Sequence, residues 1–162
     1  MVLLEFARKY KPHGLAKDDF DIMVFLQCTS PLTKAKDIEE ALELMTSSTE
    51  INTVLSGCVD SGGRFCGGFQ WVEEDINAGC RSAKSKGVRV ARRITPYKHQ
   101  RQNAPKYYRE NGAFYITEKY DLMKHKARLS GNIRVYEMPQ ARSYEIDEIE
   151  DLCGLEDILN NA

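Results

Sequence analysis

The chain has 162 residues, of which 42% are hydrophobic and 29% charged, and its formal net charge is −1. This balance is typical of a globular domain with its own core, and it excludes a disordered chain. The longest apolar run, residues 22–26, is far shorter than the roughly 18 residues of a membrane-spanning helix, and a charge at Glu5 interrupts the start too early for a signal peptide. We therefore expect a cytoplasmic protein with no membrane partner.

Cysteine and histidine give no metal pattern. The five cysteines show no CxxC spacing, and the three histidines are scattered. A structural zinc site is therefore not expected, and reduced thiols account better for the cysteines.

The charges are distributed unevenly. Ten Lys and Arg residues and no acidic residue lie between Arg81 and Arg109, whereas the rest of the chain carries 13 basic and 24 acidic residues. Such a block attracts phosphate, a carboxylate ligand or nucleic acid, and a solvated loop without a ligand is the alternative. No recognised nucleic-acid motif accompanies it, so we expect no nucleic-acid partner.

The first half of the chain predicts a βαβ unit. The apolar run at 21–27 favours a strand buried on both faces, as in a parallel sheet. A turn-rich stretch leads to a helix in which Asp37 and Glu40 read as a capping box and an apolar face follows. Residues 46–49 end this helix and 51–56 predict a second strand, so the succession indicates an α/β sandwich.

The pattern loosens between residues 57 and 100. Glycines at 62–63 and 67–68 permit a short hairpin near 65–71, and the whole stretch is either a long surface excursion or a small subdomain. Regular patterns return afterwards. They predict strands at 111–116, 132–138 and 143–147, a short helix at 118–126, and a last helix with Leu152, Leu155 and Leu159 on one face.

The first candidate site segment is Gln27-Cys-Thr-Ser-Pro-Leu32, directly after the first strand. Ligands of open α/β sheets gather outside the carboxyl ends of strands. The Gln27 amide both donates and accepts, as recognition of a base or sugar edge requires, and Thr29 and Ser30 add hydroxyls. Ordinary capping of the following helix is the alternative.

The second and third segments supply opposite charges. Arg101 and Arg109 flank a proline and two tyrosines, and a guanidinium matches a carboxylate or phosphate with two parallel hydrogen bonds; a basic loop with aromatic packing is the alternative. Glu145 and Asp147 are two residues apart, so in a strand they face the same way and suit Mg²⁺. Acidic residues before a helix also favour its positive N-terminus, which is the alternative there.

Taken in order, these segments resemble the acylneuraminate cytidylyltransferase (CMP-N-acetylneuraminic acid synthetase) family. That family has Gln-Pro-Thr-Ser-Pro-Leu after a core strand, an Arg-Gln…Pro…Asn-Gly-Ala…Tyr-Ile stretch, and Asp-Ile-Asp before its last helix. The chain has 27–32, Arg101-Gln102 with 111–116, and 145–147 at these places, and the likeness runs from about residue 21 to 159. Cys28 replaces the usual proline and Glu145 the usual aspartate. Nothing before Asp21 matches the family's Ile-Pro-Ala-Arg-x-Gly-Ser-Lys loop, which holds the triphosphate.

The resemblance implies a three-layer α/β sandwich with a mostly parallel, Rossmann-like sheet of the nucleotide-diphospho-sugar transferase type. The first strand and phosphate loop would be missing, so 1–162 would form one partial, N-terminally truncated domain. Residues 57–100 would be an excursion or a dimerisation arm of a homodimer. Residues 1–20 resemble the helix and linker ahead of the first predicted strand.

The activity that the resemblance implies is transfer of CMP from CTP to a sialic-acid-type nine-carbon sugar with release of pyrophosphate, impaired in this chain. A non-catalytic sugar-binding or scaffold relative is the alternative. The resemblance assigns Mg²⁺ and catalysis to Glu145 and Asp147. The substrate-binding residues that it implies are Gln27, Thr29, Ser30, Arg101, Gln102, Arg109, Asn111, Gly112 and Tyr115.

Overall fold

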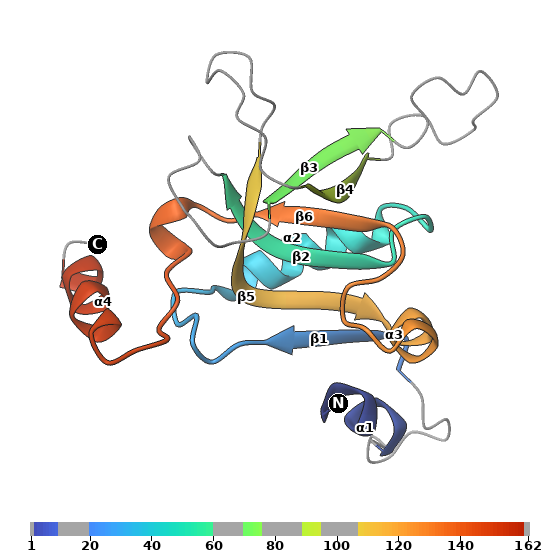
Figure 1. The fold of residues 1–162 in the computed structure, drawn as a ribbon, viewed down its shortest axis with the longest axis horizontal. Coiled ribbons are helices and arrows are strands. Elements are labelled where there is room, and N and C mark those ends of the chain that lie inside the picture. The colour runs from blue at the N-terminus through green and yellow to red at the C-terminus, as the bar shows by residue number, and fades with distance from the viewer. Residues whose placement is uncertain (1, 10–19, 60–69, 76–88, 95–106, 161–162) are drawn as a thin grey trace.

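The computed structural model describes residues 2–9, 20–59, 70–75, 89–94 and 107–160. Figure 1 shows their helices arranged around a sheet, and none of these helices is long and apolar enough to span a bilayer. In chain order the elements are α1 Val2–Lys9, β1 Ile22–Leu26, α2 Ala35–Thr46, β2 Thr53–Val59, β3 Gln70–Asp75, β4 Arg89–Ile94, β5 Tyr108–Glu118, α3 Lys119–His125, β6 Ile133–Glu137, the 3-10 helix Gln140–Arg142 and α4 Asp151–Asn160.

The strands form one mixed sheet in the order β1-β5-β2-β6-β4-β3, so the protein is α/β as expected. Among the described strands only β2 and β6 pair in parallel; β5 runs antiparallel to β1 and β2, and β4 antiparallel to β3 and β6. The prediction of a mostly parallel, Rossmann-like sheet is therefore wrong. The prediction that the first strand is buried on both faces is also wrong, because β1 is an edge strand of the described sheet and its Val24 and Leu26 side chains are exposed. An apolar run does not by itself set the direction of the neighbouring strand.

The predicted βαβ unit is present, with one strand inserted. Because β1 and β2 both pair antiparallel with β5, they point the same way with β5 between them. The inserted strand brings the end of β1 against the middle of β5, where the Gln27 N–H donates to the Ala113 carbonyl at 3.0 Å. The turn after β1 therefore begins beside the residues of the second sequence motif.

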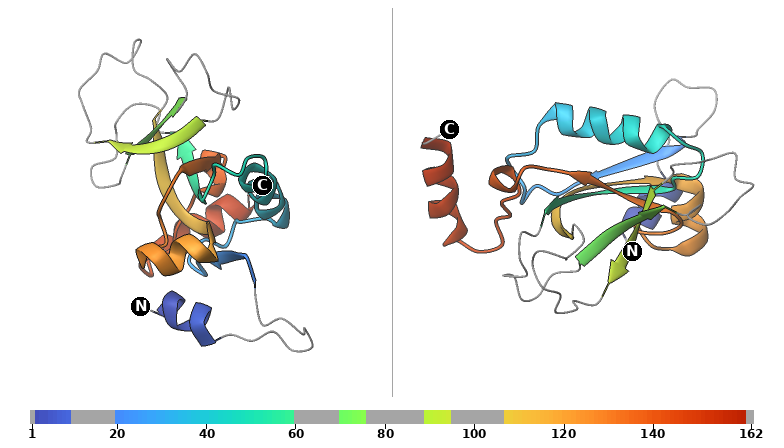
Figure 2. Two further views of the ribbon diagram at one scale, coloured as in Figure 1. Left: turned by 90° about the vertical axis from the view of Figure 1, so that its right-hand side faces the viewer. Right: turned by 90° about the horizontal axis from the view of Figure 1, so that it is seen from above.

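Helix α2 covers one face of the sheet, as Figure 2 shows from above. Its apolar stripe includes Ala41 and Met45, which pack with Val54, Phe114 and Ile116 in a buried cluster. The predicted capping box is wrong in its partners, because Asp37 is the third helical residue and accepts a hydrogen bond from the Lys34 N–H at 2.8 Å. A carboxylate there satisfies an unpaired N–H and suits the positive end of the helix.

Two further apolar clusters line the opposite face. At the β1 end, Met23 packs with Ala7 of α1 and Leu122 of α3, so helices lie on both sides of the sheet there. The other cluster lies where β3 and β4 arch over the sheet, and β3 pairs with the start of β5 as well as with β4. Its buried members are Leu55, Trp71, Ala91, Tyr108, Tyr115, Ile133 and Val135.

The stretch at 57–100 thus adds two strands to the sheet. The predicted hairpin near 65–71 falls mostly outside the described residues, and of that stretch the structure places only Gln70 and Trp71, which begin β3. The interpretation of 57–100 as a dimerisation arm stays a prediction.

The predicted strand at 143–147 is wrong. The segment pairs with no strand of the described sheet. Its hydrogen bonds include those from the Ile146 N–H to the Thr29 carbonyl at 2.8 Å and from the Asp147 N–H to Asp151 Oδ2 at 2.9 Å. The last helix is confirmed as α4, but it stands to one side of the sheet in Figure 1 and buries none of its residues. A Cβ on Gly154 would lie 2.3 Å from the Tyr144 hydroxyl oxygen, so Tyr144 reaches the backbone of this helix.

Candidate active site

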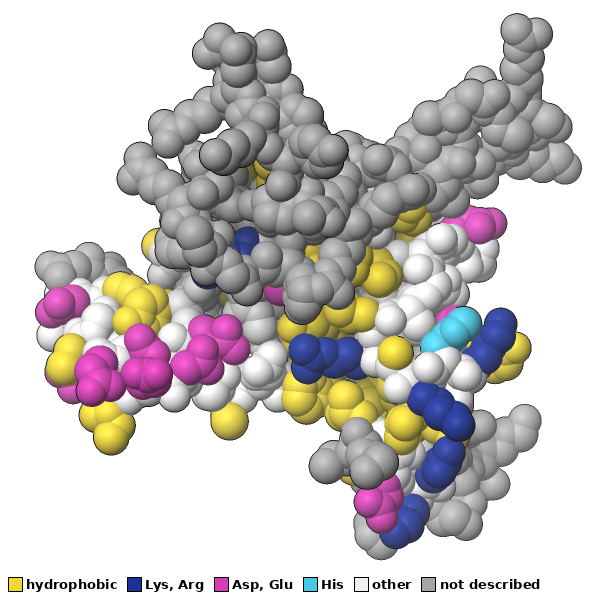
Figure 3. All heavy atoms as spheres, in the orientation of Figure 1, with side chains coloured by type: hydrophobic (Ala, Val, Ile, Leu, Met, Phe, Trp, Pro, Cys, Tyr) yellow, Lys and Arg dark blue, Asp and Glu magenta, His cyan; other side chains and the backbone are white. Residues whose placement is uncertain are grey.

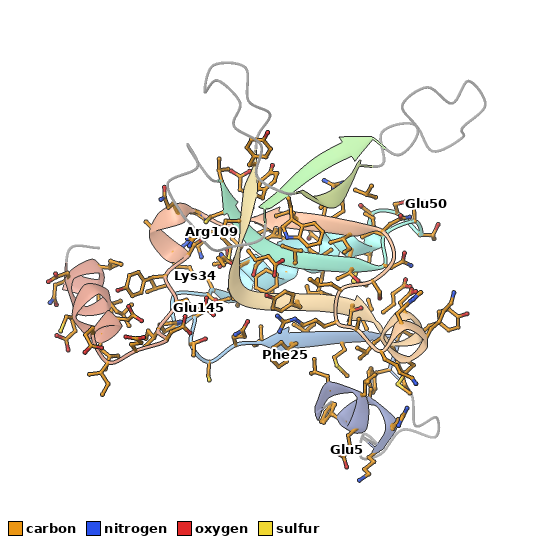
Figure 4. The ribbon with its side chains drawn as sticks, viewed as in Figure 1. Glu5, Phe25, Lys34, Glu50, Arg109 and Glu145 are labelled. Atoms are coloured by element: carbon orange, nitrogen blue, oxygen red, sulfur yellow. The ribbon has the colours of Figure 1, made fainter. Side chains whose placement is uncertain are left out.

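Two segments far apart in the sequence meet at the end of β1. The turn at 27–33 lies against the extended segment 143–147, joined by the bond between Ile146 and Thr29. The Gln27 side-chain amide donates to Glu145 Oε1 at 3.5 Å, a long and weak contact. Figure 4 shows Glu145 and Arg109 at this same end of the sheet. The first and third sequence motifs therefore face each other across one small region.

Gly112 provides the space for the Glu145 carboxylate. Its φ is +69°, a backbone conformation that glycine adopts without cost, and a Cβ there would lie 2.4 Å from Glu145 Oε1. A residue with a side chain would meet both a strained backbone and a clash. The observed position of the Glu145 carboxylate thus requires a residue without a side chain at position 112.

The surroundings of Glu145 favour its neutral form. Burial raises its pKa, and the negative charge of Asp147 raises it further. The charge of Arg109, a hydrogen-bonding contribution from Thr29 and the charge of Arg128 act in the opposite direction but do not outweigh the first two. A cation near Glu145 would offset the cost of its charge.

Tyr115 lies at the centre of a second cluster of polar side chains. Its hydroxyl donates to Glu110 Oε2 at 3.1 Å, and the Trp71 ring N–H donates to Glu110 Oε1 at 2.8 Å. Arg128 lies over the Tyr115 ring, with its Cζ 4.0 Å from the ring centroid, and its Nη2 donates to the Tyr115 hydroxyl at 3.4 Å. Burial and the charge of Glu110 raise the pKa of Tyr115 to about 12, so this hydroxyl keeps its proton at neutral pH.

Asn111 is buried, and its amide groups bond within the protein. Its nitrogen donates to Ser143 Oγ at 2.8 Å and contacts Met138 Sδ at 3.2 Å, while its oxygen accepts the Ala113 N–H at 3.3 Å. The side chain thus links β5 to the start of the segment that carries Glu145. Its implied contact with substrate stays a prediction.

Arg142 and Asp37 fix the same segment from the other side. The guanidinium of Arg142 binds both carboxylate oxygens of Asp37, with a second contact of 2.8 Å, and also donates to the Leu32 carbonyl at 3.5 Å. The Tyr136 hydroxyl lies 2.6 Å from the Glu40 carboxylate and 3.2 Å from the Asp37 carboxylate, so its single proton is donated mainly to Glu40. Burial on its own raises the pKa of Asp37, but the hydrogen bonds from Arg142 and the Lys34 backbone outweigh burial and hold this pKa below its usual value.

Two buried hydroxyl groups in the turn at 27–33 lack ordinary hydrogen-bond partners among the described residues. Thr29 Oγ1 and Ser30 Oγ are buried, and neither forms a hydrogen bond of ordinary geometry in the described part of the chain. The Thr29 hydroxyl is nevertheless close enough to Glu145 to act on its pKa. Leaving a buried hydroxyl unpaired costs about 1–3 kcal/mol, which native structures rarely accept without a reason.

An open pocket of about 420 Å³ adjoins this turn and the start of α2. Gln27, whose side chain contacts Glu145, is one of the residues that line this pocket, and most of the pocket surface is apolar. Its lining residues are Leu26, Gln27, Cys28, Ser30, Pro31, Thr33, Lys34, Ala35, Ile38 and Ala113.

The structure brings together most of the predicted site residues that it describes. Glu145 has Gln27 and Gly112 in direct reach, and its pKa responds to Thr29, Arg109 and Asp147. Tyr115 is close enough for the charge of Glu145 to act on its own pKa. Ser30 lines the neighbouring pocket, and Arg101 and Gln102 lie outside the described residues.

Sequence reasoning missed Arg128, Glu110, Trp71 and Arg142. Arg142 lies three residues before Glu145, and this proximity in the sequence was an available signal. Arg128 and Trp71 carried no signal, because their partners lie 13 and 39 positions away along the chain.

The donor set for a metal is small. Within the described ranges no three His, Cys, Asp or Glu side chains gather closely enough to hold an ion. Glu145 and Asp147 together offer two carboxylates, which suit Mg²⁺ when water and substrate phosphate supply the other ligands. Acidic side chains also gather over α4 and its approach in Figure 3, whereas Lys and Arg gather around α1 and α3. Binding of Mg²⁺ by Glu145 and Asp147 stays a prediction, because its original basis, two side chains on one face of a strand, is lost with the strand at 143–147.

Two known proteins have a distant likeness to this chain. The chain is 28% identical over 134 residues to the N-acylneuraminate cytidylyltransferase of Streptococcus agalactiae serotype III, a match that covers 83% of this chain and 29% of that protein. The enzyme of the same name from serotype Ia of this species matches equally. No protein-family model matches the chain. The chain thus has a distant likeness to a cytidylyltransferase, and it spans about 29% of the length of these relatives.

Proposed function

We propose that this chain forms the sugar-binding and metal-binding part of a nucleotidyltransferase site. The reaction would transfer CMP from CTP to a sialic-acid-type sugar. The observation that carries the proposal is the contact of Glu145 with Gln27 and Gly112, because it joins three separate sequence motifs at one point. The distant likeness to N-acylneuraminate cytidylyltransferases supports the same class.

In the proposed reaction the anomeric hydroxyl oxygen of the sugar forms a bond to the α-phosphorus of CTP. The bond from that phosphorus to the bridging oxygen breaks, pyrophosphate leaves, and the hydroxyl proton passes to solvent. Gln27 would orient the sugar, and Arg109 would neutralise an anionic group beside it. Positioning and charge neutralisation carry most of the rate in such transfers.

Glu145 and Asp147 would hold Mg²⁺, which when bound neutralises charge on the phosphate oxygens. Burial and then the charge of Asp147 raise the pKa of Glu145, and a bound cation would offset both effects. The buried Ser30 hydroxyl, which has no hydrogen-bond partner among the described residues, also favours a ligand at this turn, since a bound group or water would supply the missing hydrogen bond.

Titration calorimetry with N-acetylneuraminate, and with CTP in the presence of Mg²⁺, tests the proposal. Glu145→Gln should weaken Mg²⁺-dependent CTP binding by about tenfold, the equivalent of one lost charge-assisted contact. Glu150→Gln is the control, because Glu150 is an exposed carboxylate of the same approach to α4. Absence of binding to both ligands, or equal binding by the two variants, would refute the proposal.

Turnover is measured in parallel from pyrophosphate release. Sugar binding without CTP binding or turnover would favour the alternative, a non-catalytic sugar-binding relative. Homodimer formation belongs to the same proposal and is measured by sedimentation of the purified chain.

A further inference from the structure

Strand β1 leaves one edge of the sheet open. Among the described residues it pairs only with β5, at the end of the strand order. The Gln27 N–H donates to the Ala113 carbonyl of β5, and the backbone groups of an antiparallel pair bond at every second residue. The odd-numbered residues of β1 therefore face β5, whereas the N–H and C=O groups of Ile22, Val24 and Leu26 point outward.

This open edge lacks the local features that usually prevent a strand from pairing with another chain. Residues 22–26 contain no charged residue and no proline, and their pairing with β5 has no bulge. The Val24 and Leu26 side chains are 37% and 56% exposed. Edges that stay unpaired in water commonly carry a charge, a proline or a bulge, so β1 is suited to receive a further strand.

The edge is complementary to a second copy of itself. When two β1 strands pair antiparallel with Val24 opposite the partner's Val24, Ile22 comes opposite the partner's Leu26. Every outward N–H and C=O group then meets an outward group of the other copy, and the exposed Val24 and Leu26 side chains gain apolar neighbours on one face of the joined sheet. A two-fold axis at Val24 closes this contact, so a dimer forms rather than a fibre.

The charges at the two ends of β1 favour this antiparallel orientation. The turn after β1 contacts the acidic segment 145–157, which contains seven Asp and Glu residues and no Lys or Arg. At the other end Lys119, Lys124 and Lys126 belong to α3 or follow it, and Figure 3 shows Lys and Arg around α1 and α3. Antiparallel pairing places the acidic end of each copy beside the basic end of the other, and a net charge of −1 leaves little overall repulsion.

We propose that the open edge of β1 is a dimerisation surface, on which a second copy of this chain pairs antiparallel about Val24 and extends the sheet. This surface lies apart from residues 57–100, the predicted arm, and the inference does not depend on the transfer reaction. In the dimer Gln27 lies opposite the partner's Asp21, so the candidate site adjoins the interface.

Sedimentation equilibrium tests the surface through the residue on the two-fold axis. Val24→Lys and Val24→Glu each place two like charges opposite one another, and each should weaken the dimer by about tenfold or more. An equimolar mixture of the two variants should restore association, because each Lys then meets a Glu. Leu159→Lys is the matched control, since it puts the same charge at another exposed apolar residue, on α4, and should leave the dimer unchanged.

Amide hydrogen exchange locates the same contact. The Val24 N–H should exchange more slowly as the protein concentration rises, whereas the Phe25 N–H, which faces β5, should not change. An unweakened dimer in folded Val24→Lys, or no association on mixing, would overturn the inference and leave the proposed ligand binding intact. Protection of the Val24 N–H without association would assign the edge to another segment of the same chain and also overturn it. A monomeric unmodified chain would refute both the inference and the proposed homodimer, while calorimetry tests ligand binding separately.

Discussion

The carboxylate of Glu145 occupies the space that a side chain at Gly112 would fill. A Cβ there would lie 2.4 Å from Glu145 Oε1 and 2.9 Å from its Cδ. This contact couples strand β5 to the segment before α4, and the proposed site depends on it.

Gly112→Ala should displace Glu145 and weaken ligand binding by about tenfold. The positive φ of +69° adds a backbone penalty of about 1–2 kcal/mol. Gly131→Ala is the control, because Gly131 has a φ of +66° and a similar clash with Asn52, away from the site. Both variants should lose stability in urea unfolding, and only Gly112→Ala should lose affinity; equal affinity in the two would contradict the coupling.

Separating Asp37 from Arg142 should destabilise the fold. The Asp37 side chain is 3% exposed, so Arg142→Ala leaves a nearly buried carboxylate without its guanidinium, at a cost of about 3 kcal/mol. Removing the exposed Lys36–Glu40 pair by Lys36→Ala should cost less than about 1 kcal/mol. Urea unfolding of both variants measures the difference, and a small loss in Arg142→Ala would show that the pair does not hold the segment.

The pair of Asp37 and Arg142 should also make the stability of the fold depend on pH. Because the folded pKa of Asp37 lies below the unfolded value of 3.8, its stabilisation is present above pH 3.8 and is lost as the pH falls through the folded pKa. The stability difference between the unmodified chain and Asp37→Asn should therefore shrink on acidification below pH 4, measured by urea unfolding at several pH values. A difference that stays constant down to about pH 2 would be inconsistent with the lowered pKa.

The raised pKa of Tyr115 predicts that the protein loses stability as the pH rises in the alkaline range. Its folded pKa of about 12 exceeds the unfolded value of 10.0, so the stabilisation is complete below pH 10 and falls as the pH rises towards 12. In that interval the unmodified chain should lose up to about 1.4 kcal/mol per pH unit relative to Tyr115→Phe. Absorbance at the tyrosinate band reports the titration directly, and a Tyr115 that ionises near pH 10 would rule out its burial against Glu110.

Asn111→Ala should loosen the segment that carries Glu145. It removes the donor to Ser143 Oγ inside the protein and should cost about 1–3 kcal/mol. Asn132→Ala removes an exposed hydrogen bond to the Glu50 carbonyl and should cost less. Amide hydrogen exchange at Ile146 should accelerate in Asn111→Ala alone, and unchanged exchange there would mean that Asn111 does not anchor the segment.

Most elements of the fold could be predicted, because burial leaves a periodic pattern in the sequence. The strands around Val24, Val54 and Ile116 and the helix around Ala41 follow from apolar runs and stripes. Strand direction could not be predicted, since an apolar run reads the same in either direction. The segment at 143–147 looked like a strand, but its hydrogen bonds go to a turn and to Asn111.

The candidate site was predictable where short motifs carried it. Gln27, Gly112 and Glu145 come from three motifs, and the structure brings these residues into reach of one another. Arg128 could not be found this way, because only the fold brings it over Tyr115.

Paramagnetic broadening by Mn²⁺, used in place of Mg²⁺, tests the central claim most directly. We expect amide signals of Gln27, Gly112 and Asp147 to broaden first in a two-dimensional NMR spectrum, and Glu145→Gln to abolish the effect. Broadening confined to the acidic residues of α4, or unchanged in Glu145→Gln, would contradict a metal and substrate site at this end of the sheet.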